Sequence, residues 1–206
     1  MGFSTLLDIL GSTLVGGMLL LILFRMSDAS VKNTYLNGGE LIVQQNLAEV
    51  VRVIEYDFRK IGYCKNYNMI PDPSKSIVSA TNNSITFLTD VAVPGTYPEG
   101  DGIVDTIHYY LGSPNDLLET PNPIDRMLYR VVNNETPRGS NLGITMFNLS
   151  YFGPQGDLLP TPVSNPGAIA SIRIDLEVQD PIGYQDKYPS VFWRQIRMTA
   201  KNLNNR

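Results

Sequence analysis

The chain has 206 residues, of which 43% are hydrophobic and 17% charged, the profile of an ordered chain with room for one domain of ordinary size. The 16 Lys and Arg against 20 Asp and Glu give a formal net charge of −4, so no basic excess is available to neutralise a phosphate backbone, and we expect no direct nucleic-acid binding. A single cysteine, Cys64, and a single histidine, His108, exclude an intrachain disulfide and the common zinc-ligand spacings.

The first element is an apolar segment long enough to cross a membrane. Residues 6–24 contain one charged residue, Asp8, and at about 1.5 Å per residue such a helix reaches roughly 28 Å, close to the hydrocarbon thickness of a bilayer. The alternative is a cleaved secretory signal, because small residues at 27–29 follow the apolar core. A signal peptide begins with basic residues, however, and residues 1–14 contain none. We therefore predict a retained transmembrane and assembly helix over residues 1–26.

Asp8 makes this anchor unusual. A carboxylate in an apolar helix costs about 2.5–3.5 kcal/mol on insertion scales, so it is normally paired, placed near an interface, or functional. One interpretation puts Asp8 at the helix start, where water and the positive end of the helix dipole stabilise it. The other pairs it with a cation, such as the free amino group of a neighbouring copy, when helices bundle. Small residues that would let such helices approach closely are Gly11, Ser12, Gly16 and Gly17.

A polar break and an amphipathic stem are predicted over residues 27–62. The break ends in Asn37-Gly38-Gly39, which we expect to interrupt or loosen the helix. A second helix then begins near Glu40 and stops at Gly62. Its apolar stripe is expected to pack on the rest of the protein and comprises Leu47, Val51, Ile54, Phe58 and Ile61.

Residues 63–206 are predicted to form a β-rich head domain. Short segments rich in β-branched and aromatic residues, separated by Pro, Gly and Asn, predict strands over residues 84–89, 106–111, 127–132, 144–152, 171–179 and 191–199. Apolar residues in 171–179 alternate with polar ones, among them Asp175, which requires one buried and one solvent-facing side. Because a one-sided sheet needs a cover, we predict an α+β architecture in which the long N-terminal helix packs on an antiparallel sheet.

The residues offer little for catalysis or metal binding. The spacing of Asp101, Asp105 and His108 would suit a metal or acid–base role, but His108 should lie on the wetter face of its strand, and no nucleophile motif or phosphate loop accompanies it. Cys64 is interpreted as a small buried packing residue. Residues 98–102 are interpreted as a polar turn rather than a calcium loop. We predict no catalytic residue, no metal, no cofactor and no small-molecule substrate.

Several segments, in order, resemble one family. The opening GFSTLLDILGSTLVGGMLLLI is similar to the start of type IV pilins, and VIEYDFRKIGYCKN, residues 53–66, is similar to the helix end of PilW-type minor pilins and J-type pseudopilins. Segments similar to the strands and closing residues of the same group follow, namely TIHYYLG, DRMLYRVV, ITMFNLSYFGPQGDLL, ASIRIDLEVQ and FWRQIRMTAKNLNNR. Together these matches cover nearly the whole chain.

The resemblance to the type IV pilin and type II secretion pseudopilin superfamily implies a structural filament subunit rather than an enzyme. It implies an inner-membrane anchor with an extracytoplasmic head, and other pilin or pseudopilin subunits as partners. It further implies a subunit-pairing role for Asp8 and processing at Gly2 and Phe3. The alternative function is a membrane-tethered extracytoplasmic binding or adhesion module that shares the anchor and the sheet but does not polymerise.

Overall fold

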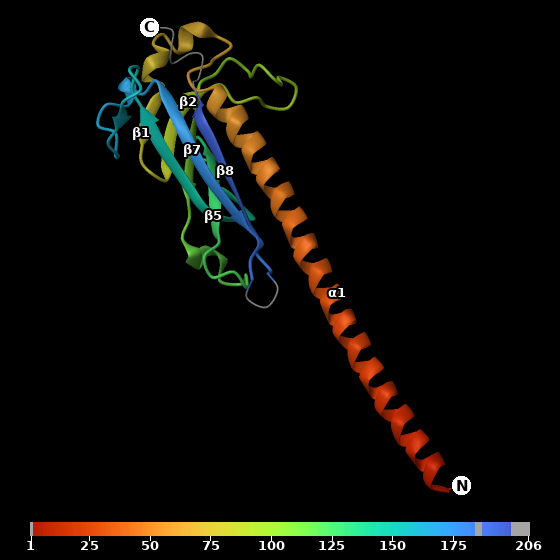
Figure 1. Ribbon diagram of the computed structural model, residues 1–206. Helices are drawn as coiled ribbons and strands as arrows, with labels where there is room; N and C mark the ends of the chain where they lie inside the picture. The colour runs from red at the N-terminus through yellow and green to blue at the C-terminus, as the bar shows by residue number, and fades with distance from the viewer. Residues whose placement is uncertain (1, 184–186, 199–206) are drawn as a thin grey trace.

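The computed structural model describes residues 2–183 and 187–198. One helix, α1 (Gly2–Arg59), leads into an eight-stranded sheet. The C-terminal part of α1 lies along the sheet, whereas its N-terminal part projects far beyond it (Figure 1). The predicted α+β architecture, a long N-terminal helix on an antiparallel sheet, is confirmed.

The sheet is antiparallel at every pairing described, with strand order β1-β2-β3-β4-β5-β7-β8 and β6 paired to β5. The strands are β1 (Ile77–Ala80), β2 (Ser84–Thr89), β3 (Asp105–Leu111), β4 (Arg126–Val132), β5 (Arg138–Phe152), β6 (Leu158–Leu159), β7 (Ser171–Gln179) and β8 (Ser190–Met198). Short 3-10 helices lie in the connections at Tyr67–Met69, Pro73–Lys75, Pro114–Leu117 and Pro166–Ala168.

Each of the six predicted strands overlaps an observed strand, namely β2, β3, β4, β5, β7 or β8. The predictions for β2 and β7 have the observed bounds, whereas β5 begins at Arg138 rather than at residue 144. The short strands β1 and β6 were not predicted. The last residue predicted for the C-terminal strand, Thr199, lies outside the described residues.

The interruption expected at residues 37–39 is wrong, and so is a second helix starting near Glu40, because α1 is continuous from Gly2 to Arg59. A glycine costs a helix about 1 kcal/mol relative to alanine, which the hydrogen-bond ladder on both sides can absorb. Gly39 is moreover buried against the head: a Cβ at this position would stand 2.5 Å from Oδ2 of Asp180. Gly39 therefore allows the helix and the head to approach each other closely, and it does not interrupt the helix.

The C-terminal part of α1 buries one side on the sheet. Val43, Val50, Ile54 and Phe58 are all buried in the hydrophobic core. The ring of Phe58 lies edge-on to Phe87 of β2, with centroids 5.5 Å apart, an arrangement favoured between aromatic quadrupoles. The helix ends at Arg59, and after a turn Gly62, at a φ of +74°, donates its N–H to the Leu88 carbonyl at 2.9 Å.

The alternation predicted for β7 holds for its apolar residues but is wrong for Asp175. This carboxylate lies on the side expected to face solvent, yet the residue is only 7% exposed. Nε of Arg173 lies 3.5 Å from Oδ2 of Asp175, and Nε of Arg194 on β8 lies 2.5 Å from Oδ1. Two arginine side chains thus cover and neutralise Asp175, which the alternating pattern predicted to be exposed to solvent.

Candidate functional site

The N-terminal part of α1 is the most prominent functional feature of the molecule. Every residue from 2 to 31 is exposed, and this stretch includes a strongly apolar window without a buried residue. By length and composition the helix is a candidate membrane span. A helix that is apolar on all sides is stable only in lipid or within a larger packed assembly, so this part of the chain requires an environment that the single copy does not provide.

The residues predicted for assembly all lie on this projecting segment. Phe3 is 81% exposed, and Asp8 is exposed with no ion pair to any residue that the structure describes. A Cβ would meet no atom within 4 Å at the glycines, which are Gly2, Gly11, Gly16 and Gly17. The fold therefore brings none of these residues into contact with the head and leaves them available to another molecule.

The residues predicted to join stem and sheet lie at their junction. Ile54, Phe58 and Ile61 are each 1% exposed, whereas Leu47 and Val51 are partly buried against the same core. Sequence reasoning missed two further apolar positions, Val43 and Val50. Both lie inside the helix predicted from Glu40 and on its packing side, since Val43, Leu47, Val50 and Ile54 follow one another at steps of four, three and four residues.

A buried ionic cluster at the junction was also missed. The Asp57 carboxylate of α1 accepts two bonds from Arg130 of β4, from Nε at 2.6 Å and from Nη2 at 3.2 Å. The hydroxyl of Tyr109 on β3 donates to the same carboxylate at 2.5 Å. Burial and then the charge of Asp57 raise the pKa of Tyr109 well above its usual value, so its hydroxyl stays a donor. The signal in the sequence was an acidic residue between Ile54 and Phe58 on the apolar stripe.

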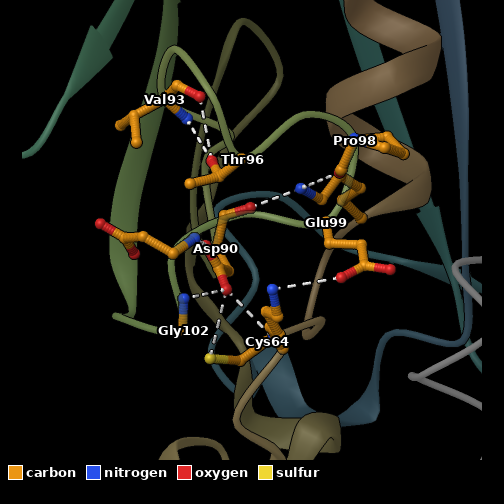
Figure 2. Close-up of polar contacts among 10 residues, drawn as sticks. Cys64, Asp90, Val93, Thr96, Pro98, Glu99 and Gly102 are labelled. Carbon is orange, nitrogen blue, oxygen red and sulfur yellow. Dashed lines mark hydrogen bonds and ion pairs between the residues drawn. The ribbon is translucent and has the colours of Figure 1, made fainter.

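A second buried carboxylate organises the loop beyond the end of α1 (Figure 2). Asp90 is fully buried and accepts the backbone N–H groups of Lys65 and Asp101, both at 3.0 Å, and of Gly102 at 2.9 Å. The Cys64 thiol donates to it at 3.7 Å. Burial raises the pKa of this thiol, which fits a packing residue better than a reactive one.

Lysine side chains tie the same loop to the helix end (Figure 2). Nζ of Lys60 donates to the Asp90 carbonyl at 2.5 Å and to the Pro98 carbonyl at 3.4 Å, and Lys65 pairs with Glu99 at 3.2 Å. Burial lowers the pKa of Lys60, and the charge of Asp90 opposes that shift. The loop predicted to be a polar turn is therefore held by a buried anion and its donors.

The residues weighed for catalysis or metal binding have other partners. Asp105 accepts the Val91 N–H at 2.9 Å and Nδ2 of Asn133 at 2.8 Å. His108 is half-buried on the outer face of β3, where its ring lies tilted by 33° against that of Tyr110, with centroids 4.9 Å apart. Within residues 2–183 and 187–198, no group of three or more His, Cys, Asp or Glu side chains is placed to hold a metal ion.

Comparison with protein-family models and with curated protein sequences finds no match. Among solved structures, the chain is similar to a type IV-like pilin from Thermus thermophilus. The two sequences are 10% identical, the similarity covers 78% of this chain and 96% of the pilin, and the TM-score is 0.41.

Proposed function

We propose that this protein is a structural subunit of a type IV pilus-like or pseudopilus filament. The observation that carries the proposal is the division of α1: its C-terminal part is packed on the sheet, while its N-terminal part is apolar and exposed on every side. In the membrane, lipid covers the exposed part. In a filament, the same surfaces of neighbouring copies cover one another.

Two features of the projecting segment support assembly in addition to anchoring. The open sides of Gly11, Gly16 and Gly17 allow another helix to approach closely. Asp8 supplies a carboxylate whose cost in an apolar setting of about 2.5–3.5 kcal/mol is offset when a cation of another subunit pairs with it. The partners are then further pilin-like subunits, and processing at Gly2 and Phe3 provides a new amino terminus.

In this proposal the anchor lies in the inner membrane and the sheet domain is extracytoplasmic. The role is structural and not catalytic, because the buried carboxylates at Asp57 and Asp90 hold the helix end and the adjacent loop instead of facing a substrate cleft. The partners with which the protein assembles would identify it as a pilus subunit or as a pseudopilus subunit.

The test is the state of the full chain in the cells that produce it. Cells are sheared, membranes are extracted in mild detergent, and both fractions are sized and identified by mass spectrometry. We expect the protein in sheared fibres or in a defined complex with pilin-like subunits. Recovery solely as a detergent-bound monomer would contradict the proposal.

The second candidate is a membrane-tethered binding or adhesion module that does not polymerise. The observation in its favour is the loop organised by Asp90, whose neighbourhood carries two strongly exposed aromatic side chains, Tyr67 at 79% and Tyr97 at 75%. A rigid loop presenting aromatic rings is suited to recognition. This candidate predicts a monomer that loses ligand affinity when both tyrosines are replaced by serine.

A further inference from the structure

Two loops lie at the end of the head from which the N-terminal part of α1 projects (Figure 1). One connects β3 to β4 over residues 112–125, and the other, between β7 and β8, includes residues 180–183 and 187–189. Asn122 joins them, because its backbone N–H donates to the Pro181 carbonyl at 3.2 Å and its Nδ2 donates to the Asp180 carbonyl at 3.4 Å. The two loops therefore form one surface, which we call the anchor-side surface.

The anchor-side surface exposes three large aliphatic side chains. Leu118 is 80% exposed, Ile124 51% and Ile182 69%. The Ile124 N–H donates to Oδ1 of Asn122 at 3.1 Å, and the Ile182 N–H donates to Oδ1 of Asp180 at 3.0 Å, so the backbone is held while the side chains face outward. Single exposed apolar residues are common on proteins, so exposure alone indicates no partner. The position of this surface beside the anchor does.

The helix α1 keeps this surface close to the membrane in which the proposed anchor lies. Gly39 packs on Asp180, where a Cβ would stand 2.5 Å from the carboxylate. Toward the N-terminus, Lys32 is the last half-buried residue, since residues 2–31 are all exposed. Phe24, at the end of the apolar segment, lies about 12 Å from Lys32 along the helix. The headgroup layer of a bilayer fills roughly 5–7 Å of that distance.

Tilt of the helix brings the head closer still. Spanning helices tilt by about 20° on average, and such a tilt lowers a point about 20 Å to the side of the helix axis by about 7 Å. Because α1 is continuous from Gly2 to Arg59, the head tilts together with the span. This tether holds the loops at a high effective concentration next to the lipid, which lets a small apolar surface bind that would not bind a membrane by itself.

The charges on the two loops indicate which lipid the surface fits. The exposed charged residues among those described in the loops are Asp116, Glu119 and Lys187. Asp116 already accepts the Ser113 N–H and the Tyr129 hydroxyl, both at 3.2 Å. Glu119 and Lys187 have opposite charges, so the loops offer no basic excess to anionic headgroups. The surface therefore suits a zwitterionic headgroup layer, which the aliphatic side chains enter.

We propose that the anchor-side surface rests in the headgroup layer of the membrane that holds the anchor of the same chain, with Leu118, Ile124 and Ile182 inserted among zwitterionic lipids. The membrane then contacts the subunit at the span and at the head, and this second contact sets the tilt of the head before the subunit enters a filament. The inference rests on the anchor of the proposed function and applies both to a polymerising subunit and to a solitary module.

The experiment places a polarity-sensitive fluorophore on single cysteines of the full chain, in a Cys64→Ala background, in phosphatidylcholine vesicles at a low protein-to-lipid ratio. Leu118→Cys reports on the anchor-side surface and Val15→Cys on the span. Tyr67→Cys is the matched control, since Tyr67 is 79% exposed in the loop after the other end of α1. Nitroxide-labelled phosphatidylcholine should quench more than half of the fluorescence at positions 118 and 15 and leave position 67 unchanged.

A second variant removes the neighbouring apolar side chains while keeping the label at Leu118. Ile124→Ser with Ile182→Ser should reduce the quenching severalfold, whereas Val78→Ser with Leu158→Ser, at exposed apolar positions of β1 and β6, should not. Quenching at position 15 without quenching at 118, equal quenching at 67 and 118, or an unchanged signal in the first double variant would each overturn the headgroup contact and leave the anchor intact. Absence of quenching at position 15 would overturn the anchor itself.

Discussion

The carboxylate of Asp57, in the buried part of the stem, stands 2.6 Å from Nε of Arg130 on β4. This ion pair joins the only long helix among the described residues to the middle of the sheet, and Tyr109 extends it to β3. Asp57 is 3% exposed and the Arg130 side chain 30%, so water does not fully compensate either charge once its partner is removed. The cluster, together with the apolar junction, holds the helix where it crosses the sheet, and so helps to set the direction in which its apolar N-terminal part projects.

Asp57→Asn should therefore destabilise the protein by about 1–3 kcal/mol, because Arg130, whose side chain is 30% exposed, loses its counter-charge where water can replace it only in part. The free energy of unfolding is measured by urea titration of the full chain in detergent micelles. Glu55→Gln is the control: Glu55 pairs with Arg59 at 3.5 Å on the surface, so its loss should cost less than about 0.5 kcal/mol. Equal effects of the two changes would show that the buried pair is not a structural link.

Phe58→Asp should abolish the cooperative melt of the sheet domain. Phe58 is 1% exposed and contacts the rings of Phe87 and Tyr109, so the substitution places an unpaired carboxylate in the core. Such burial costs several kcal/mol, comparable to the roughly 5–15 kcal/mol that stabilise a domain. Near-ultraviolet circular dichroism against temperature measures the effect. A transition like that of the unaltered protein would mean that α1 does not cover the sheet in solution.

The adjacent glycines Gly38 and Gly39 should respond oppositely to alanine. A Cβ at Gly38 meets no atom within 4 Å, so Gly38→Ala should stabilise the helix by about 0.5–1 kcal/mol. A Cβ at Gly39 would stand 2.5 Å from the Asp180 carboxylate and 3.8 Å from Pro189, so Gly39→Ala should lower stability by displacing the head from the helix. Melting temperatures of the two variants decide the matter. The same sign for both would contradict the close approach at Gly39.

Asp8→Asn should separate anchoring from assembly. If Asp8 pairs with a cation of another subunit, the amide leaves that cation uncompensated, so the variant should reach the membrane in normal amounts and be missing from sheared fibres. If Asp8 only favours a helix start, the change should cost about 0.3–1 kcal/mol and leave assembly intact. Immunoblots of membrane and fibre fractions compare the variant with the unaltered protein. Normal incorporation would remove the pairing role.

The single histidine should give the head a pH-dependent stability. Partial burial lowers the pKa of His108, so the unfolded chain takes up the proton first as the pH falls. Stability is then fully present above the unfolded pKa of about 6.5 and declines as the pH falls below it. Melting temperatures between pH 7.5 and 5.5 should fall less in His108→Gln. An identical pH slope in the variant would show that other groups control this range.

Local patterns in the sequence were enough to predict six of the eight strands and the packing side of the stem. The bounds of β2 and β7 follow from their alternation, since side chains in a strand point to opposite faces at a period of two residues. The placement of Ile54 and Phe58 follows from helical periodicity, which puts residues three and four apart on one side. That the N-terminal segment is a candidate membrane span likewise follows from its length and composition alone.

What the sequence by itself determined is thus the kind of each element and the side that it buries, because both depend on residues close together in the chain. Only the tertiary structure decided which polar residues are buried. Asp57 and Arg130 meet across 73 positions, and Asp175 is covered by Arg194 from the neighbouring strand. It also decided that α1 continues through Gly39, which approaches Asp180, a residue 141 positions later in the chain. A carboxylate is stable away from water only when its partners are in place, and no local pattern contains those partners.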